Sequence, residues 1–215
     1  MKTLILSLLI ITLCLNAHAA DWNTSGTVRT SGGELHYRVS GTGKPLLLLH
    51  GYSGYGEQWR GFLDEFVDNY KVIAVDLPGH GQSSKLRSSF IIADAARDMW
   101  QLMDHLGVKQ IHGVGYSAGG MTLLQMALQE PSRVQSMVLA ASAFTVLEDR
   151  SGEPFELLPE AYRQDLLRNH NGDMEKIRSM LSAKFVADIK VSDLRDLKTP
   201  TLLVLRILAH VDHRF

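Results

Sequence analysis

Five short apolar runs, bounded by turn residues or by helical patterns, are the feature that most limits what this chain can fold into. They are Leu46–Leu49, Val72–Val75, Ile111–Val114, Met137–Ala141 and Thr201–Leu205. Runs of this length are typical of strands that are buried on both faces of a sheet. Because helical patterns separate several of the runs, the strands should pair in parallel through right-handed crossovers. The sequence therefore predicts an α/β fold with a mostly parallel sheet flanked by helices.

Two helices are expected between these strands. In the first, apolar residues recur at steps of four and three from Ile92 to Leu106, which places them on one face. The second covers Met121–Leu128 and ends before Pro131, because a proline cannot continue a helix. Both helices should pack their apolar faces against the sheet.

Two other segments depart from this alternation. Thr27–Thr30 and Glu34–Val39 flank a glycine-containing turn, and they predict an antiparallel hairpin at one edge of the sheet. Residues 143–198 are charged and free of strand patterns, with helices expected over Leu157–Asn169 and Asp173–Phe185. We expect this block to be an insertion over one end of the sheet.

The first 20 residues have the pattern of an export signal. Lys2 precedes an apolar run that ends at Leu15, and Ala17-His18-Ala19 then supplies the small-x-small pattern of a signal peptidase site. The run is shorter than the roughly 20 residues that a membrane-spanning helix needs. We expect cleavage after Ala19 or Ala20 and a periplasmic or secreted protein, with no membrane partner after cleavage.

The charge balance excludes several classes of protein. The chain has 22 Lys and Arg residues against 23 Asp and Glu residues, a net charge of −1, and 45% of its residues are hydrophobic. These values argue against a disordered chain and against a nucleic-acid binder that neutralises phosphates. The single cysteine, Cys14, lies in the expected signal and supports neither a disulfide framework nor a cysteine-based zinc site. We therefore expect a small-molecule substrate and no nucleic-acid partner.

A candidate nucleophile follows the third apolar run. Gly115-Tyr116-Ser117-Ala118-Gly119 matches the Gly-x-Ser-x-Gly turn, in which a strand passes sharply into a helix and exposes the serine hydroxyl above the sheet. The oxyanion that forms during acyl transfer needs two backbone N–H donors. We expect one from Ala118, directly after the serine, and the other from Tyr52, in the His50-Gly51-Tyr52 loop after the first run.

The same residues allow a second interpretation. Gly113-Val114-Gly115-Tyr116-Ser117-Ala118 also fits Gly-x-Gly-x-x-Ala, a dinucleotide-binding fingerprint between a strand and a helix. That fold needs an acidic residue at the end of the next strand to hold the ribose hydroxyls. Here Met137–Ala141 ends in Ser142, so the pattern favours a serine nucleophile over a nucleotide site.

Three motifs in order resemble the α/β-hydrolase fold family. They are Leu49-His50-Gly51-Tyr52, Asp76-Leu77-Pro78-Gly79-His80-Gly81-Gln82-Ser83 and Gly115-Tyr116-Ser117-Ala118-Gly119-Gly120. The resemblance covers about residues 27–205. It implies a serine esterase or related acyl hydrolase with Ser117 as nucleophile, an oxyanion hole from Tyr52 and Ala118, and no cofactor or catalytic metal. Asp76 and His80 belong to the family's turn pattern and are expected to be structural.

With this resemblance the chain divides into four parts. Residues 1–20 are the signal peptide, and residues 21–142 are the N-terminal part of the α/β-hydrolase core. Residues 143–198 are a small helical cap or lid, and residues 199–215 are a core strand and an incomplete C-terminal tail. The resemblance implies a further strand and helix that the tail does not spell.

The family's catalytic order is serine, acid, histidine, with the last two after the strand expected at Thr201–Leu205. Arg206 stands where the family has glycine, and the chain then reaches Phe215. Asp212 and His213 are candidates for the acid and the base, and Glu148 or Asp149 could replace the acid. His210-x-x-His213 with Asp212 also has metal-ligand character, although a third distant ligand is missing. The alternative function is a truncated, catalytically impaired remnant or binding protein of the same fold.

Overall fold

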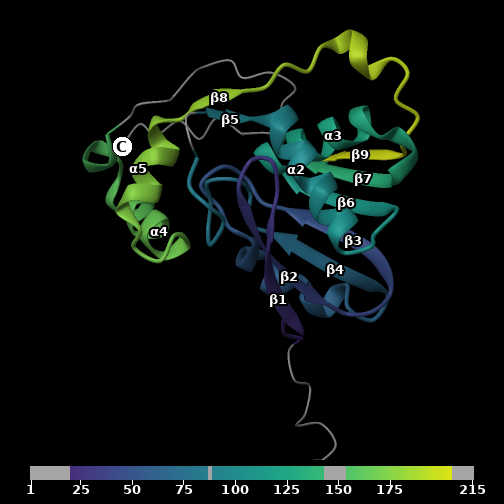
Figure 1. Cartoon of the computed structure of the whole chain (residues 1–215), viewed down its shortest axis with the longest axis horizontal. Coiled ribbons are helices and arrows are strands. Elements are labelled where there is room, and N and C mark those ends of the chain that lie inside the picture. Colours follow the sequence, from purple (N-terminus) through teal and green to yellow (C-terminus); the bar gives the residue numbers. More distant parts are fainter. Residues whose placement is uncertain (1–19, 87–88, 143–153, 205–215) are drawn as a thin grey trace, which may run out of the picture.

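The computed structural model describes residues 20–86, 89–142 and 154–204 (Figure 1). Within these residues one sheet has the strand order β1-β2-β4-β3-β6-β7-β9. Its strands are β1 (Thr24–Arg29), β2 (Glu34–Ser40), β3 (Lys44–Leu49), β4 (Tyr70–Val75), β6 (Ile111–Tyr116), β7 (Val134–Ala140) and β9 (Thr201–Val204). Every apolar run that predicted a strand therefore forms one. Residues 1–19 of the expected signal peptide lie outside the described residues.

Strand directions confirm the expected α/β architecture. β1 pairs with β2 and β2 with β4 in antiparallel fashion, so the hairpin forms one edge of the sheet. All the remaining pairs, from β4 through β3, β6 and β7 to β9, are parallel. The carboxyl ends of β3, β4, β6 and β7 consequently meet at one edge, where a ligand site is expected in open α/β sheets.

Strand β3 is buried on both faces, as its continuous apolar run predicts. Leu47 and Leu49 face the larger core cluster, which includes buried residues of the helices α2 (Ile92–His105) and α3 (Ala118–Gln129). Leu46 and Leu48 point to the other face and pack with Leu63 of the 3-10 helix η1 (Gly56–Glu65). The sheet therefore has helical elements on both sides, an arrangement typical of mostly parallel sheets.

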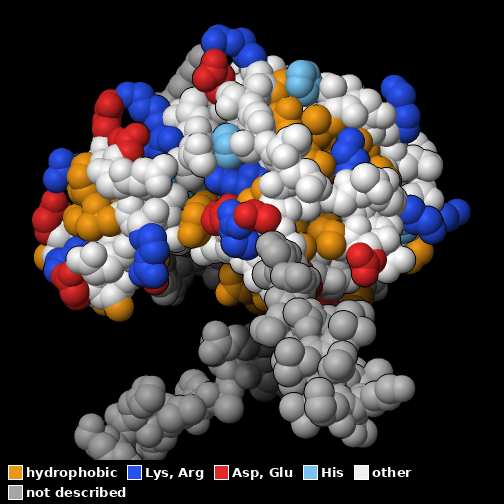
Figure 2. Space-filling view, turned by 90° about the horizontal axis from the view of Figure 1, so that it is seen from below, with side chains coloured by type: hydrophobic (Ala, Val, Ile, Leu, Met, Phe, Trp, Pro, Cys, Tyr) orange, Lys and Arg blue, Asp and Glu red, His pale blue; other side chains and the backbone are white. Residues whose placement is uncertain are grey.

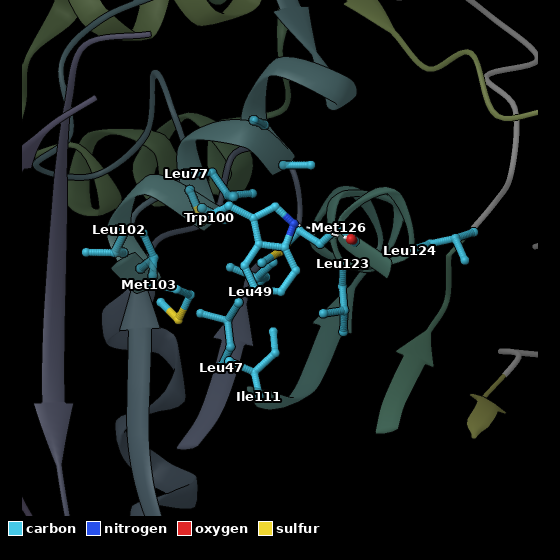
Figure 3. Close-up of a cluster of buried hydrophobic side chains, with 14 of the residues drawn as sticks. Leu47, Leu49, Leu77, Trp100, Leu102, Met103, Ile111, Leu123, Leu124 and Met126 are labelled. Atoms are coloured by element: carbon cyan, nitrogen blue, oxygen red, sulfur yellow. Dashed lines mark hydrogen bonds between the residues drawn. The ribbon is translucent and has the colours of Figure 1, made fainter. Parts of the chain in front are cut away.

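Trp100 of α2 lies in the middle of the larger core cluster (Figure 3). Its indole Nε1–H donates to the carbonyl of Met126 in α3, with an N···O distance of 3.3 Å. The guanidinium of Arg133 stacks on the indole ring, 4.2 Å from its centre. The indole thus joins α2 to α3 without leaving its polar atom unpaired.

Strand β9 differs from the expectation of a strand buried on both faces. It pairs with β7 in the predicted place, but Leu202 and Leu203 are 59% and 49% exposed. The reason is its position, because β9 is the last strand of the sheet at this edge within the described residues. An apolar run predicts a strand, whereas burial depends on which elements cover it.

The described part of the insertion, residues 154–198, is called the cap below. It contains the two expected helices as α4 (Glu160–Asn169) and α5 (Met174–Ser182). The expectation of a strand-free segment was wrong. Lys184–Val186 forms β8, which pairs in parallel with β5 (Ser89–Ile91), so the second helix ends before Phe185. Phe185 instead stacks on Phe90, with 5.4 Å between ring centres.

Short helical turns complete the described structure. They are η2 (Pro131–Arg133), η3 (Phe155–Leu157) and η4 (Val191–Leu194). On the face shown in Figure 2, Lys and Arg side chains lie next to Asp and Glu side chains. Among the described residues, no helix has the length and apolar character needed to cross a membrane.

Candidate active site

Ser117 occupies a sharp turn between β6 and α3. β6 ends at Tyr116, α3 begins at Ala118, and Ser117 between them has φ 51° and ψ −117°. A non-glycine residue in this region stores about 1–3 kcal/mol of backbone strain and needs surroundings that hold it there. One such restraint is the hydrogen bond from the Ser117 N–H to the carbonyl of Ala140 in β7, at 2.9 Å. The geometry agrees with the turn that the sequence pattern predicts.

Glycines around Ser117 allow backbone segments to approach each other very closely. A Cβ at Gly115 would lie 2.5 Å from the Cα of Gly120, and a Cβ at Gly119 would lie 2.3 Å from the carbonyl oxygen of Leu49. Real Cβ atoms essentially never approach backbone atoms this closely, so no other residue fits without backbone movement. The glycines of the motif thus let α3 pack against the ends of β6 and β3.

The loop after β3 lies directly against this turn. A Cβ at Gly51 would be 2.8 Å from the ring of Tyr116 and 3.3 Å from the Cβ of Ser117. We call residues Gly51–Gly54 the oxyanion loop. This loop contains Tyr52. Ala118 is buried in the first turn of α3, where backbone N–H groups have no acceptor within the helix. The structure therefore brings the loop carrying Tyr52 together with Ser117 and Ala118, while their catalytic roles stay predictions.

His50 links the oxyanion loop to the loop after β4. Its buried Nδ1 donates to the carbonyl of Gly51 at 2.7 Å, and its Nε2 accepts from the N–H of Leu77 at 2.9 Å. Both ring nitrogens are satisfied by a neutral imidazole, since Nε2 must be unprotonated to accept. Burial lowers the pKa of His50 from 6.5 to about 4. His50 thus supports the loop by bonding to its backbone and to the loop after β4.

Asp76 fixes the turn that follows β4. Its carboxylate accepts from the N–H of Gly56 at 2.6 Å, from the N–H of Gln82 at 2.8 Å and from Arg38 at 3.0 Å. Burial by itself raises the pKa of the Asp76 carboxyl, but His36 and the positive charge of Arg38 lower it well below its usual range. These contacts suit the structural role predicted for Asp76.

Two further histidines lie between the core and the cap. His80 of the core donates from Nδ1 to the carbonyl of Pro78, and His170 of the cap donates from Nδ1 to the carbonyl of Leu166. Their ring centres are 6.0 Å apart, and the Nε2 atom of each ring is buried without a hydrogen-bond partner. Burial lowers the pKa of both rings. Burial therefore favours the neutral form of each ring. Neither ring forms a hydrogen bond with Ser117 among the described residues.

A general base for Ser117 is not found among the described residues. Within the described ranges no imidazole forms a hydrogen bond with the Ser117 hydroxyl. Asp212, His213, Glu148 and Asp149 all lie outside the described residues, so their candidacy stays a prediction. The same holds for the metal interpretation of the tail, and no group of three or more His, Cys, Asp or Glu side chains within the described ranges could hold a metal.

Two contacts between the cap and the oxyanion loop were not predicted from the sequence. The Tyr52 hydroxyl donates to the carbonyl of Met180 at 2.8 Å, and the Asn169 side chain donates to the carbonyl of Ser53 at 3.2 Å. Each contact joins residues more than 100 positions apart, and neither belongs to a short motif. Local pattern analysis has no signal that could identify such pairs.

Similar proteins agree with the geometry. Residues 44–201 match the family described as alpha/beta hydrolase fold. The dihydrolipoyllysine-residue acetyltransferase component of the acetoin cleaving system from Cupriavidus necator is 38% identical over 104 residues, which are 48% of this chain and 28% of that protein. The magnesium-chelatase 30 kDa subunit from Rhodobacter capsulatus is 36% identical over 145 residues, which are 65% of this chain and 50% of that protein.

A crystal structure of a hydrolase from Pseudomonas aeruginosa has a TM-score of 0.67 and 24% identity. The similarity covers 86% of this chain and 81% of the other, and it shows a shared fold. The chain spans half or less of the length of the two curated relatives named above.

Replacing Gly115 with alanine tests the close packing at Ser117. The added methyl group would meet the Gly120 backbone at 2.5 Å, so we expect Gly115→Ala to lower the free energy of unfolding by about 2 kcal/mol or more. Gly61→Ala is the matched control, because a Cβ there meets nothing within 4 Å. Urea unfolding measures both variants, and equal stability of the two would contradict the packing argument.

The buried histidines predict a loss of stability in mild acid. Because the pKa of His50 is about 4 in the fold and 6.5 in the unfolded chain, the unfolded state binds the proton more readily between these values. The contribution of neutral His50 to the free energy of unfolding is therefore fully present above pH 6.5. Protonation of His50 in the unfolded chain should lower the free energy of unfolding by about 2 kcal/mol by pH 5. His80 and His170 act in the same direction.

Urea unfolding at pH 7.5 and pH 5 measures this dependence. His50→Asn should be less stable at pH 7.5 and should lose less stability on acidification than the unsubstituted protein. His105→Gln, which changes an exposed histidine, should keep the full dependence. A pH dependence unaltered in His50→Asn would show that His50 is not responsible.

Proposed function

The chain belongs to the α/β-hydrolase fold family, and on this premise we propose that it hydrolyses carboxylic esters or related acyl compounds through an acyl-enzyme on Ser117. The observation that carries the proposal is the strained backbone of Ser117 at the turn between β6 and α3, with the oxyanion loop packed against it. Such a turn lifts a serine hydroxyl toward the ligand edge of the sheet. A packing role alone would not need a serine in this conformation.

The reaction would proceed in two stages. Ser117 Oγ would attack the acyl carbonyl while a base takes its proton, and the backbone N–H groups of Tyr52 and Ala118 would bind the oxyanion. The alcohol would leave with a proton from the conjugate acid of that base. Water would then add to the acyl-enzyme and release the carboxylic acid and free Ser117.

The base required by this route has to come from outside the described residues. His213 is the candidate base and Asp212 the candidate acid, with Glu148 and Asp149 as alternative acids. A serine hydroxyl is a weak nucleophile unless a base accepts its proton. The activity of the proposed enzyme therefore depends on where these side chains lie.

A second candidate function is a binding protein with the same fold and little catalysis. The observation that favours it is that no imidazole of the described residues hydrogen-bonds to Ser117. Without a base, residual catalysis would come from the oxyanion hole and substrate binding alone. The two curated relatives named above are an acetyltransferase component and a chelatase subunit, so their names suggest no common substrate for this chain.

We further propose that the protein is exported to the periplasm or the medium. The support is the sequence pattern of residues 1–20, with its basic start, short apolar run and small residues before Ala20. Mass spectrometry of protein from the periplasm and medium should show a chain that begins at Ala20 or Asp21. A full-length chain confined to the cytoplasm would contradict export.

Fluorophosphonate labelling tests whether Ser117 is a nucleophile. The reagent should modify the folded protein at one site, and Ser117→Ala should abolish the modification because its methyl group cannot form the phosphonate ester. Ser117→Ala should also lower hydrolysis of short p-nitrophenyl esters by about 10³-fold or more. The label is located by peptide mass spectrometry, with Ser132→Ala, at an exposed serine in η2, as the control.

The two candidate functions give different results in this experiment. Labelling and ester hydrolysis that both require Ser117 support the hydrolase. Folded protein that neither reacts with the fluorophosphonate nor hydrolyses the esters would reject the hydrolase in favour of the binding protein.

A further inference from the structure

The cap contacts the oxyanion loop through two hydrogen bonds. Asn169, the last residue of α4, donates from Nδ2 to the carbonyl of Ser53 at 3.2 Å. The Tyr52 hydroxyl donates to the carbonyl of Met180, near the end of α5, at 2.8 Å. Two consecutive loop residues are therefore bonded to two different cap helices.

The loop has a backbone conformation that needs such support. Ser53 has φ 66°, which is unfavourable for a residue other than glycine. Within the loop, Gly54 donates from its N–H to the carbonyl of Gly51 at 3.0 Å, which closes a tight turn. Strained residues persist only where their surroundings restrain them. Asn169 supplies such a restraint at the strained residue itself.

The side chain of Tyr52 is enclosed by both parts of the molecule. Its ring packs edge-on against the rings of His80 and Phe90 in the core and of Phe185 in β8. The distances between ring centres are 4.9, 5.4 and 5.3 Å, respectively. Tyr52 also packs against the apolar cluster of the cap that includes Leu166. Its backbone N–H is the predicted oxyanion donor, so one residue belongs to both the candidate active site and the cap interface.

The cap elements that carry these contacts are firmly held. His170 follows Asn169 and is 1% exposed, with its N–H and Nδ1 both bonded to the carbonyl of Leu166. At the start of α5, Asp173 accepts from the N–H of Lys176, and the Lys176 ammonium donates to the carbonyl of Gly81 in the core at 2.9 Å. Asn169 therefore projects from an anchored turn and can hold the loop in one position.

We propose that Asn169 is a positioning residue that, together with the Tyr52 hydroxyl, couples the placement of the cap to the geometry of the oxyanion hole. The inference rests on the proposed function for its catalytic meaning, because Tyr52 is the predicted donor. An oxyanion donor is effective only when its position is set before the reaction. Movement of α4 and α5 by a bound acyl group would thus be transmitted to the donor through two hydrogen bonds.

Hydrogen–deuterium exchange of the full chain tests the coupling without requiring activity. In Asn169→Ala and Asn169→Asp the donor to Ser53 is lost, and the amide of Gly54 should exchange about five- to tenfold faster, as for loss of one neutral hydrogen bond. Asn169→Asp keeps nearly the same size and replaces the donor with an acceptor. Arg168→Ala is the matched control, because its exposed side chain forms an ion pair with Asp165 and, among the described residues, has no bond to the loop.

Tyr52→Phe removes the second contact and keeps the backbone N–H. It should also speed exchange in the oxyanion loop, and its combination with Asn169→Ala should have a larger effect than either change. Exchange in β3 and β6 should stay unaltered. Unchanged loop exchange in folded Asn169→Ala or Asn169→Asp would overturn the proposal. Faster exchange spread over the whole sheet would also overturn it, since that result means general destabilisation.

Ester hydrolysis separates positioning from simple stabilisation. Asn169→Ala should lower kcat about tenfold with little change in KM, because the loosened donor acts in the transition state. Arg168→Ala should leave both constants unchanged. If the unsubstituted protein hydrolyses no ester, the proposed function fails, and loop exchange alone decides the coupling. Active protein whose kcat is unaffected by Asn169→Ala and Asn169→Asp would refute the catalytic part.

Discussion

The close approach of three backbone segments at Ser117 is the constraint on which the site depends. The turn after β6 is packed against the ends of β3 and β7, and Gly115, Gly119 and Gly51 leave no room for a Cβ directed at their neighbours. The resulting packing restrains Ser117 in a conformation that costs about 1–3 kcal/mol in isolation. Tertiary packing, rather than the local preference of the chain, therefore holds Ser117 in this conformation.

Buried polar groups extend this constraint into the surrounding loops. His50 joins the oxyanion loop to the loop after β4, and Asp76 joins that loop to η1 and to Arg38 of β2. These groups are buried and bonded, so each depends on its partners to offset the loss of water. Tyr52 and Asn169 continue the network into the cap. Hydrogen bonds thus join the loops around Ser117 to the cap.

Much of the fold could be predicted from local patterns. The run Leu46–Leu49 specified a strand buried on both faces, and the glycine–serine pattern placed Ser117 between β6 and α3. The errors came where the signal was short or depended on neighbours. β8 has three residues, too few to show a periodicity, and its partner β5 is far from it in the chain. Leu202 and Leu203 have strand character, yet their exposure depends on what lies beside β9.

The sequence by itself determined the α/β class, the family motifs and the place of Ser117 between a strand and a helix, because each of these is a pattern of residues close together in the chain. Only the tertiary structure decided that the oxyanion loop contacts the turn at Ser117 through Gly51. It also decided that Asn169 bonds to Ser53 and that Tyr52 bonds to Met180. These contacts join residues far apart in the chain. Their existence follows from how the cap packs on the core, and a linear pattern does not encode that packing in any one segment.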